Sequence, residues 1–247
     1  MPNKLLLLDF DGVIVNSIDE CLLISYNAFQ QFENTGVPLT DDLSNIALSY
    51  QRYFNSNRSF VRPAAEYYLL HQAYKENIEI IDNKSYKELL ILHKDKLLFY
   101  QKVFFNERNR LRLVNKKKWL RLHSVYNNLA EYWNILSRIY DIFIVSNKDK
   151  VSIILLMNHF DLPIKDNQIF GVEFGTDKSI IIENIIRSTS TKLENVYFID
   201  DNLDNLKSVK DLNIKLYHAM WGYGDTQEND DSNIEKIYPE DILQRLI

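Results

Sequence analysis

Four short apolar runs, each closed by polar residues, constrain this 247-residue chain more than any other feature of its sequence. Such runs are typical of strands buried inside a sheet. Because strands that alternate with amphipathic helices form parallel sheets, we predict a doubly wound α/β core. The runs are Leu5 to Leu8, Ile142 to Val145, Val196 to Ile199 and Ile214 to Tyr217, and the helical segments between the last three are Val151 to Phe160, Ser179 to Ile186 and Leu203 to Leu212.

The stretch from about residue 18 to about residue 132 carries no strand signal. Apolar residues there recur at helical spacing, for example from Leu89 through Leu97 to Phe105. We therefore predict two domains: an α/β core formed by residues 1–17 and 133–247, and an all-helical cap formed by residues 18–132, inserted after the first strand.

Composition excludes several classes of protein. Hydrophobic residues make up 46% and charged residues 26% of the chain, which excludes a disordered or collagen-like protein. The net charge of -5 does not suggest a nucleic-acid binder, and no apolar stretch is long enough to span a bilayer, so we expect a soluble protein. Cys21 is the single cysteine and cannot form an internal disulfide, which favours a reducing cytoplasm. Residues 225–233 are predicted to form a solvated loop.

Two carboxylates, Asp9 and Asp11, lie one residue apart directly after the first run, and Gly12 follows them. Because ligands collect beyond the carboxyl ends of parallel strands, we expect both side chains to project into that crevice, with Gly12 permitting a tight turn. One carboxylate can attack phosphorus, since water can break the resulting acyl phosphate, and the other can handle protons. A capped turn without catalytic function would explain the same residues.

A second acidic pair, Asp200 and Asp201, closes the third run. With Asp9 and Asp11, either of these carboxylates would complete the oxygen shell of a hard octahedral cation such as Mg²⁺. Asn205, one turn into the next helix, is placed to orient a ligand or a water. The alternative is an aspartate helix cap with an acidic first turn, which explains one carboxylate but not the adjacent pair.

Ser146, Asn147 and Lys178 are the candidates for holding an anion. Ser146 and Asn147 follow the second run, and the Ser146 hydroxyl can donate to a phosphoryl oxygen or cap the helix that begins near Lys148. Lys178 stands at the entrance to a helix, where the dipole disfavours a cation, so a nearby anion would explain it. An isolated lysine at this position would otherwise be solvated surface.

These four clusters, in this order, resemble the four motifs of the haloacid dehalogenase-like hydrolase superfamily, and the resemblance covers nearly the whole chain. The helical insertion corresponds to the cap of phosphoglycolate phosphatase-like and β-phosphoglucomutase-like members. The resemblance implies that Asp9 is the nucleophile and a metal ligand. It implies that Asp11 is the general acid and base and binds the metal through its backbone carbonyl, and that Ser146 and Lys178 hold the phosphoryl oxygens.

The resemblance also implies that Asp201 is the last metal ligand, with Asp200 beside it as an auxiliary ligand. The Asp200-Asp201 pair replaces a more frequent Gly-Asp, and Asn16 replaces an acid that is common after the first motif. Asp11 favours phosphate esters, because members that cleave carbon-halogen or carbon-phosphorus bonds lack an aspartate there. The segment Trp221-Gly222-Tyr223-Gly224 is similar to a closing loop of the phosphoglycolate phosphatase-like members, and a simple turn is its alternative.

The predicted cap carries a basic stretch between Lys102 and Arg121, and two more arginines, Arg58 and Arg62, lie before it. Arg62 and Arg108 are candidates for gripping a carboxylate or second phosphate of the substrate through their planar guanidinium groups. A solvated helix face explains most of these charges better. Nucleic-acid contact is not favoured, because the aromatic residues nearby fall at helical spacing among leucines, which is typical of a core.

The function that these residues favour is Mg²⁺-dependent hydrolysis of a small phosphomonoester through a phospho-aspartate at Asp9. A phosphomutase, which returns the phosphoryl group to a sugar instead of to water, is the alternative enzyme. A binding protein on the same scaffold is the alternative outside enzymes, although four intact clusters argue against it.

Overall fold

The computed structural model describes residues 4–224 and 231–247, and most of the predicted loop at residues 225–233 therefore lies outside the described residues. The chain forms two compact units. Met1–Asn16 and Ser124–Ile247 form the first, which we call the core unit, and Ser17–His123 form the second, which we call the helical unit. The second boundary lies earlier than the expected residue 132, because helix α6 (Asn127–Ile139) packs against a strand of the core unit.

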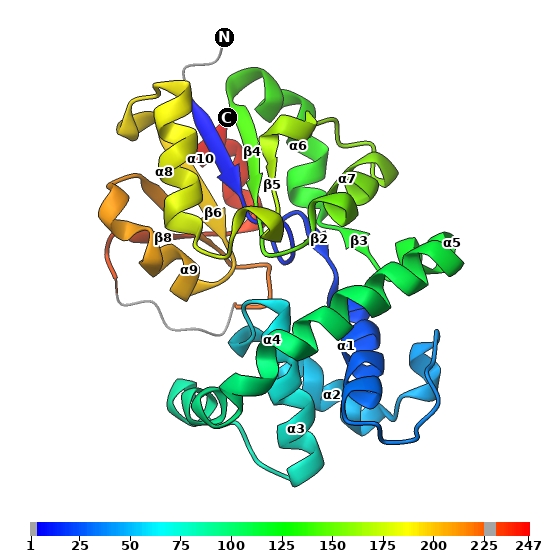
Figure 1. Ribbon diagram of the computed structural model, residues 1–247. Coiled ribbons are helices and arrows are strands. Elements are labelled where there is room, and N and C mark those ends of the chain that lie inside the picture. The colour runs from blue at the N-terminus through cyan, green and yellow to red at the C-terminus, as the bar shows by residue number, and fades with distance from the viewer. Residues whose placement is uncertain (1–3, 225–230) are drawn as a thin grey trace. The chain divides into compact units, whose positions relative to one another are not determined.

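The core unit is built on a parallel sheet of six strands in the order β5-β4-β1-β6-β7-β8 (Figure 1). The doubly wound α/β prediction is confirmed, and each predicted apolar run lies in or overlaps one of these strands. Two strands were not predicted: β5 has only two residues, and β8 at the sheet edge has two adjacent exposed residues between its buried ends. The strands are β1 (Leu5–Leu8), β4 (Asp141–Val145), β5 (Ile169–Phe170), β6 (Val196–Asp200), β7 (Lys215–Ala219) and β8 (Ile234–Ile237).

Helices flank the sheet because successive strand residues point to opposite faces and both faces are apolar. Leu5 and Leu7 of β1 pack with Phe198 of β6 in a cluster that includes the apolar sides of α8 and α9. The helix predicted over Leu203 to Leu212 ends earlier, at Ser208, and a short 3₁₀ turn follows. The helices of this unit are α6, α7 (Lys150–His159), α8 (Lys178–Thr189), α9 (Leu203–Ser208) and α10 (Ile242–Leu246).

The strand order places β1 at the switch point of the sheet. After β5 the chain crosses to the other side of β1, where it adds β6, β7 and β8 in turn. Ligands of doubly wound sheets bind beyond the carboxyl ends of the strands at such a point. Immediately after β1, a short antiparallel ribbon of β2 (Val15–Asn16) and β3 (Ser124–Val125) begins and ends the insertion.

The helical unit is all-helical in its described residues, and its centre is aromatic. The rings of Phe54, Tyr67 and Phe104 stack on one another, and Tyr100 donates to the Ser25 carbonyl from a fully buried position. The helices are α1 (Ile18–Phe32), α2 (Leu48–Asn57), α3 (Tyr67–Glu76), α4 (Asn83–Val114) and α5 (Lys116–Arg121).

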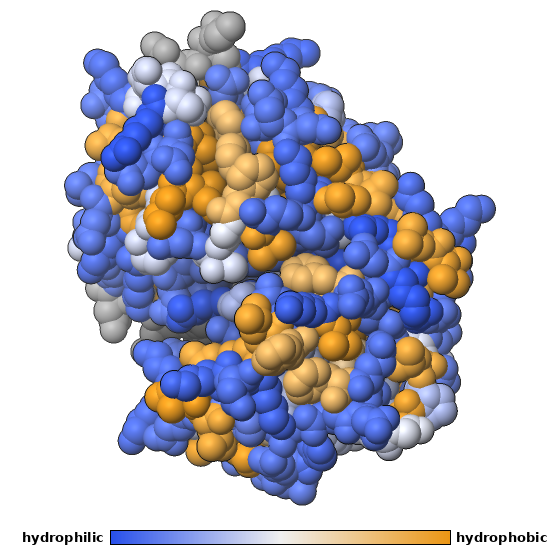
Figure 2. Space-filling model, in the orientation of Figure 1, coloured by the Kyte–Doolittle hydropathy of each residue, from blue (hydrophilic) through white to orange (hydrophobic). Residues whose placement is uncertain are grey.

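Helix α4 is the longest element, and apolar side chains gather over it on the face that Figure 2 shows. Its buried side carries Leu89, Phe104 and Leu111, whereas Leu98 and Phe99 are exposed. The apolar residues of α4 therefore recur at the expected helical spacing, but they cover a broader part of the helix surface than the side that is buried. In the part of the chain that the structure describes, no helix is long and apolar enough to cross a membrane.

Candidate active site

Three carboxylates of the core unit meet at the carboxyl ends of two neighbouring strands. Asp9 follows β1, Asp200 is the last residue of β6, and Asp201 follows it. One oxygen from each of the three lies within 4.8 Å of the others, and all three residues are buried. Pairing of β1 with β6 in register brings these residues together, because Leu8 lies opposite Ile199. Hard divalent cations prefer such a set of oxygen donors, so the residues fit a Mg²⁺ ion.

Lys178 lies among these carboxylates, where its ammonium nitrogen is 2.8 Å from Asp9 Oδ1 and 2.7 Å from Asp200 Oδ2. It is the first residue of α8, whose N-cap is Asp177. The sequence predicts an anion near Lys178, and the carboxylates of Asp9 and Asp200 provide it. Burial alone would lower the pKa of Lys178, but the carboxylates of Asp200 and Asp9 outweigh this effect and raise it. The lysine is consequently a fixed positive charge.

The Asp9 carboxyl has a raised pKa. Burial is the largest cause, and the neighbouring Asp200 and Asp11 add to it, while Lys178 opposes it, so that the pKa rises from 3.8 to about 6. Asp9 Oδ1 makes the ion pair with Lys178 but no well-aligned hydrogen bond. An incompletely compensated buried carboxylate of this kind is what a cation would stabilise.

Asp200 is more completely satisfied than Asp9. Besides Lys178, it accepts from the Asn202 backbone N–H at 2.8 Å and from Asn205 Nδ2 at 3.1 and 3.2 Å. These donors occupy both carboxylate oxygens, so Asp200 serves first to hold Lys178 and the start of α9 in place. Asn205 therefore orients an aspartate of the cluster, whereas the sequence predicts that it orients a ligand or a water.

A loop that follows β7 holds Asp201. The Tyr223 backbone N–H donates to Asp201 Oδ2 at 2.7 Å, and His218 Nε2 lies 3.0 Å from the Asp201 carbonyl oxygen. Burial lowers the pKa of His218, which favours the neutral ring. A Cβ atom on Gly224 would lie 1.9 Å from that carbonyl oxygen, so only glycine fits there.

The same loop is tied to the turn after β1. Trp221 Nε1 donates to the Val13 carbonyl at 3.0 Å, and the Tyr223 hydroxyl donates to Asn16 Oδ1 at 3.2 Å. The segment Trp221-Gly222-Tyr223-Gly224 is thus more than a simple turn, because it links Asp201 to the first motif. Asn16, which stands where an acid is common, accepts one of these bonds.

Asp11 is not one of the three clustered carboxylates, although its charge is close enough to raise the pKa of Asp9. Gly12, with a φ of +92°, turns the chain after it, and the Gly12 N–H donates to the Val15 carbonyl at 2.9 Å. The Asp11 carboxylate pairs with Lys148, whose ammonium nitrogen lies 3.1 Å from Oδ1. Lys148 is not among the site residues that the sequence predicts, although it follows β4 in the same turn as Ser146, and this position is the signal that points to it.

Ser146 is buried beyond the end of β4, and Asn147 next to it is half-buried. The alternative role of Ser146 as a helix cap is wrong, because Asp149 caps α7 by accepting from the Ser152 N–H at 2.9 Å. Instead, Ser146 Oγ accepts from the Lys148 N–H at 3.3 Å. Because a hydroxyl can donate as well as accept, this bond leaves Ser146 able to donate to an anion.

The two arginine candidates of the helical unit differ in their surroundings. Arg108 is buried and forms an ion pair with buried Glu20, with Nε 2.6 Å from Oε1 and Nη2 3.1 Å from Oε2. This ion pair gives Arg108 a structural role inside the helical unit, so we do not carry it forward as a substrate ligand. Arg62 is exposed. Trp119 and Phe104 are fully buried, as expected for core residues.

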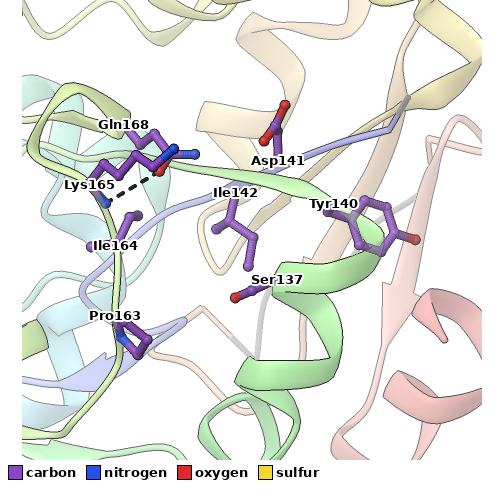
Figure 3. A pocket seen from close by; sticks show the side chains of 8 residues that line it. All are labelled: Ser137, Tyr140, Asp141, Ile142, Pro163, Ile164, Lys165 and Gln168. Carbon is purple, nitrogen blue, oxygen red and sulfur yellow. Dashed lines mark hydrogen bonds between the residues drawn. The ribbon is translucent and has the colours of Figure 1, made fainter. Parts of the chain in front are cut away.

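A cavity of about 410 Å³ lies in the core unit (Figure 3), and none of the three clustered aspartates lines it. Tyr140, Asp141 and Ile142 line it at the start of β4, whereas Ser146 follows the opposite end of that strand. The cavity therefore belongs to the amino-terminal edge of the sheet.

No family model matches the chain, and no curated protein matches it in sequence. Solved structures do match over nearly the full length of both chains. A predicted phosphoglycolate phosphatase from Haemophilus somnus has a TM-score of 0.63 and 14% identity, covering 99% of this chain and 98% of its own. A predicted phosphatase from Clostridium acetobutylicum has a TM-score of 0.61 and 16% identity, with 99% and 100% covered.

A third structure, a HAD-superfamily hydrolase of subfamily IA, variant 1, from Geobacter sulfurreducens, has a TM-score of 0.58 and 13% identity, with 99% of this chain and 96% of that chain covered. All three carry the same architecture across almost the whole chain. The structure and these similarities together show that this chain has the fold of the haloacid dehalogenase-like hydrolases.

Proposed function

We propose that this protein is a Mg²⁺-dependent phosphatase that hydrolyses a small phosphomonoester through a phospho-aspartate at Asp9. The observation that carries the proposal is the meeting of Asp9, Asp200 and Asp201 around Lys178 at the switch point of the sheet. The candidate site has four carboxylates, including Asp11, but only the two ammonium groups of Lys178 and Lys148 among the described ion pairs to balance their negative charge. A divalent cation would balance this excess of negative charge.

In this proposal, the Asp9 carboxylate attacks the phosphorus in line while the ester bond to the leaving oxygen breaks. The Asp11 carboxyl gives its proton to that oxygen and then, as a carboxylate, takes a proton from the water that attacks the phospho-aspartate. Inorganic phosphate leaves and Asp9 is regenerated. Lys178 and Ser146 hold the phosphoryl oxygens during both transfers.

Mg²⁺ would be held by Asp9 and Asp201, with Asp200 as an auxiliary ligand and the Asp11 backbone carbonyl as a further one. When bound, the ion neutralises charge on the attacking carboxylate and the phosphoryl group. The chain's own contribution is to fix these oxygens, since the loop around Gly224 and the Asn205 side chain hold Asp201 and Asp200 before any ion binds.

A screen of phosphorylated metabolites, with and without Mg²⁺, tests the proposal. Phosphoglycolate belongs in the screen because one of the similar structures is named for it. We expect release of inorganic phosphate that requires Mg²⁺, and loss of that release in Asp9→Asn. Full activity in Asp9→Asn would show that Asp9 is not the nucleophile. Transfer of the phosphoryl group to a second substrate hydroxyl instead of to water would identify a phosphomutase.

Arg62 remains the proposed contact of the helical unit for a second anionic group of the substrate, because it is exposed while Arg108 is buried. Its effect belongs to substrate binding, since a guanidinium group that holds a carboxylate or phosphate acts equally on the bound substrate and the transition state.

A further inference from the structure

Lys148 is the most deeply buried ammonium group of the core unit that the proposed chemistry does not use. Its side chain has 0% exposure, and its Nζ lies 3.1 Å from Asp11 Oδ1 and 3.4 Å from Asp11 Oδ2. Taking an ammonium group out of water is costly, and removing its partner leaves an uncompensated buried charge. The Asp11 carboxylate therefore stabilises the buried charge of Lys148, and the ion pair in turn holds the Asp11 carboxylate in one orientation.

The backbone of Lys148 is fixed on both sides. Its N–H donates to Ser146 Oγ at 3.3 Å, and its carbonyl accepts from the Val172 N–H at 3.1 Å. The Ser146 N–H in turn donates to the Phe170 carbonyl at 2.9 Å. The segments that follow β4 and β5 thus fix the backbone of Lys148, and this fixed backbone places its ammonium group beside Asp11.

The position of the Asp11 carboxylate differs from that of the other acids. Among the described residues, the oxygens that cluster within 4.8 Å come from Asp9, Asp200 and Asp201, and none comes from Asp11. Lys178 holds two of those three aspartates, while Lys148 holds Asp11. Lys148 thus pairs with the carboxyl group that lies outside the three-aspartate cluster, and this group is the one suited to proton transfer.

We propose that Lys148 is a positioning residue that keeps the Asp11 carboxyl group apart from the metal ligands and in place to protonate the leaving oxygen. The inference rests on the proposed phosphatase function and adds the residue that separates the two roles of the acids. Misplacement of a proton donor by about 1 Å can cost roughly a hundredfold in rate, so the effect of losing Lys148 is measurable.

The test compares Lys148→Met with the wild-type protein on two substrates, an alkyl phosphate that the wild type hydrolyses and p-nitrophenyl phosphate. The value of kcat/KM reports the first phosphoryl transfer, and p-nitrophenolate leaves readily without a proton. We expect kcat/KM for the alkyl phosphate to fall by about 10- to 100-fold, the size of a general acid contribution, and that for p-nitrophenyl phosphate by less than about threefold. Equal losses on the two substrates would overturn the proposal.

Two further variants keep the test decisive if Lys148→Met alone does not fold. Lys148→Arg retains the positive charge and should keep the wild-type ratio of the two kcat/KM values. In an Asp11→Asn background, Lys148→Met gives a double variant that lacks both charges. There it should change kcat/KM for the alkyl phosphate by less than about threefold, because coupled residues are not additive. A further tenfold loss in that background would show that Lys148 acts independently of Asp11. If the wild type hydrolyses neither substrate, the phosphatase proposal fails instead.

Discussion

Lys178 Nζ lies 2.8 Å from Asp9 Oδ1, and both side chains are buried. This contact joins the first residue of α8 to the end of β1, two parts of the chain that lie far apart in sequence. A buried ammonium group beside the proposed nucleophile can also stabilise charge that develops on the phosphoryl group, because little water is present to screen it.

Replacement of Lys178 by methionine is expected to lower kcat by about 100- to 1,000-fold, the usual cost of one preorganised donor at a developing charge. Lys178→Arg should retain more activity because it keeps the charge. Steady-state kinetics on a substrate from the screen measures both. A change confined to KM would contradict the role, since it would mean that Lys178 binds the ground state and the transition state equally.

The rate of the first phosphoryl transfer should depend on the pKa of Asp9. This pKa is about 6 in the metal-free protein, and the nucleophile must be deprotonated. We therefore expect kcat/KM at low Mg²⁺ to rise as the pH increases through about 6. High Mg²⁺ should shift this rise to lower pH, because the ion favours the ionised carboxylate of Asp9. A pH profile at two Mg²⁺ concentrations measures the shift. An unchanged profile would argue against Asp9 as a metal ligand.

The metal-free protein should be more stable when Asp9 is neutral. The pKa of Asp9 is raised on folding from 3.8 to about 6. The contribution of this carboxyl group to the free energy of unfolding is therefore fully present below pH 3.8 and is lost as the pH rises through 6. We expect Asp9→Asn to increase the free energy of unfolding at pH 7.5 by roughly 1 to 3 kcal/mol. Urea unfolding in EDTA measures this, and equal stability of the two proteins at pH 4 is the control.

Mg²⁺ should stabilise the wild-type protein against heat. An ion that binds only the folded state at about 100 times its Kd contributes roughly 2.7 kcal/mol, and a domain of this size gains about 2 to 4 °C per kcal/mol. Asp9→Asn should show a much smaller increase in Tm. An equal increase in both proteins would place the bound ion away from the Asp9 cluster.

Replacement of Gly224 by alanine is expected to disturb Asp201 directly, because the added Cβ would lie 1.9 Å from the Asp201 carbonyl oxygen. The loop must shift, and overpacking of this kind costs about 1 to 3 kcal/mol of stability. We also expect weaker Mg²⁺ binding, measured by titration calorimetry. Tyr223→Phe is the matched control, since it keeps the Tyr223 N–H bond to Asp201 and removes the hydroxyl that bonds to Asn16.

The two arginine candidates should separate by experiment. Arg108→Met removes the arginine partner of the buried Glu20 carboxylate and should cost about 3 to 5 kcal/mol of stability. Arg62→Ala removes an exposed side chain and should change stability by less than about 0.5 kcal/mol, while raising KM for a substrate with a second anionic group. A KM unaffected by Arg62→Ala would remove this residue from substrate binding.

The sequence by itself determined the α/β core and brought most of the candidate site residues to one edge of its sheet. Apolar runs at Leu5, Ile142 and Val196 predict buried strands because only such segments avoid water on both faces, and polar residues that end parallel strands must meet at one edge. The sequence therefore predicts that Asp9, Asp200 and Asp201 lie together, as they do in the structure. It could not find the two-residue strand β5, whose pairing depends on a neighbour rather than on local pattern.

Only the tertiary structure decided how the charges are divided among partners. Lys148 and Arg108 look like ordinary basic residues in the sequence, yet burial pairs the first with Asp11 and the second with Glu20. Sequence spacing carries no information about such pairs, because Lys148 and Asp11 lie 137 residues apart and meet only when β1 and β4 pair. The residues that can do the chemistry follow from local pattern, whereas the role of each follows from the partner that folding places beside it.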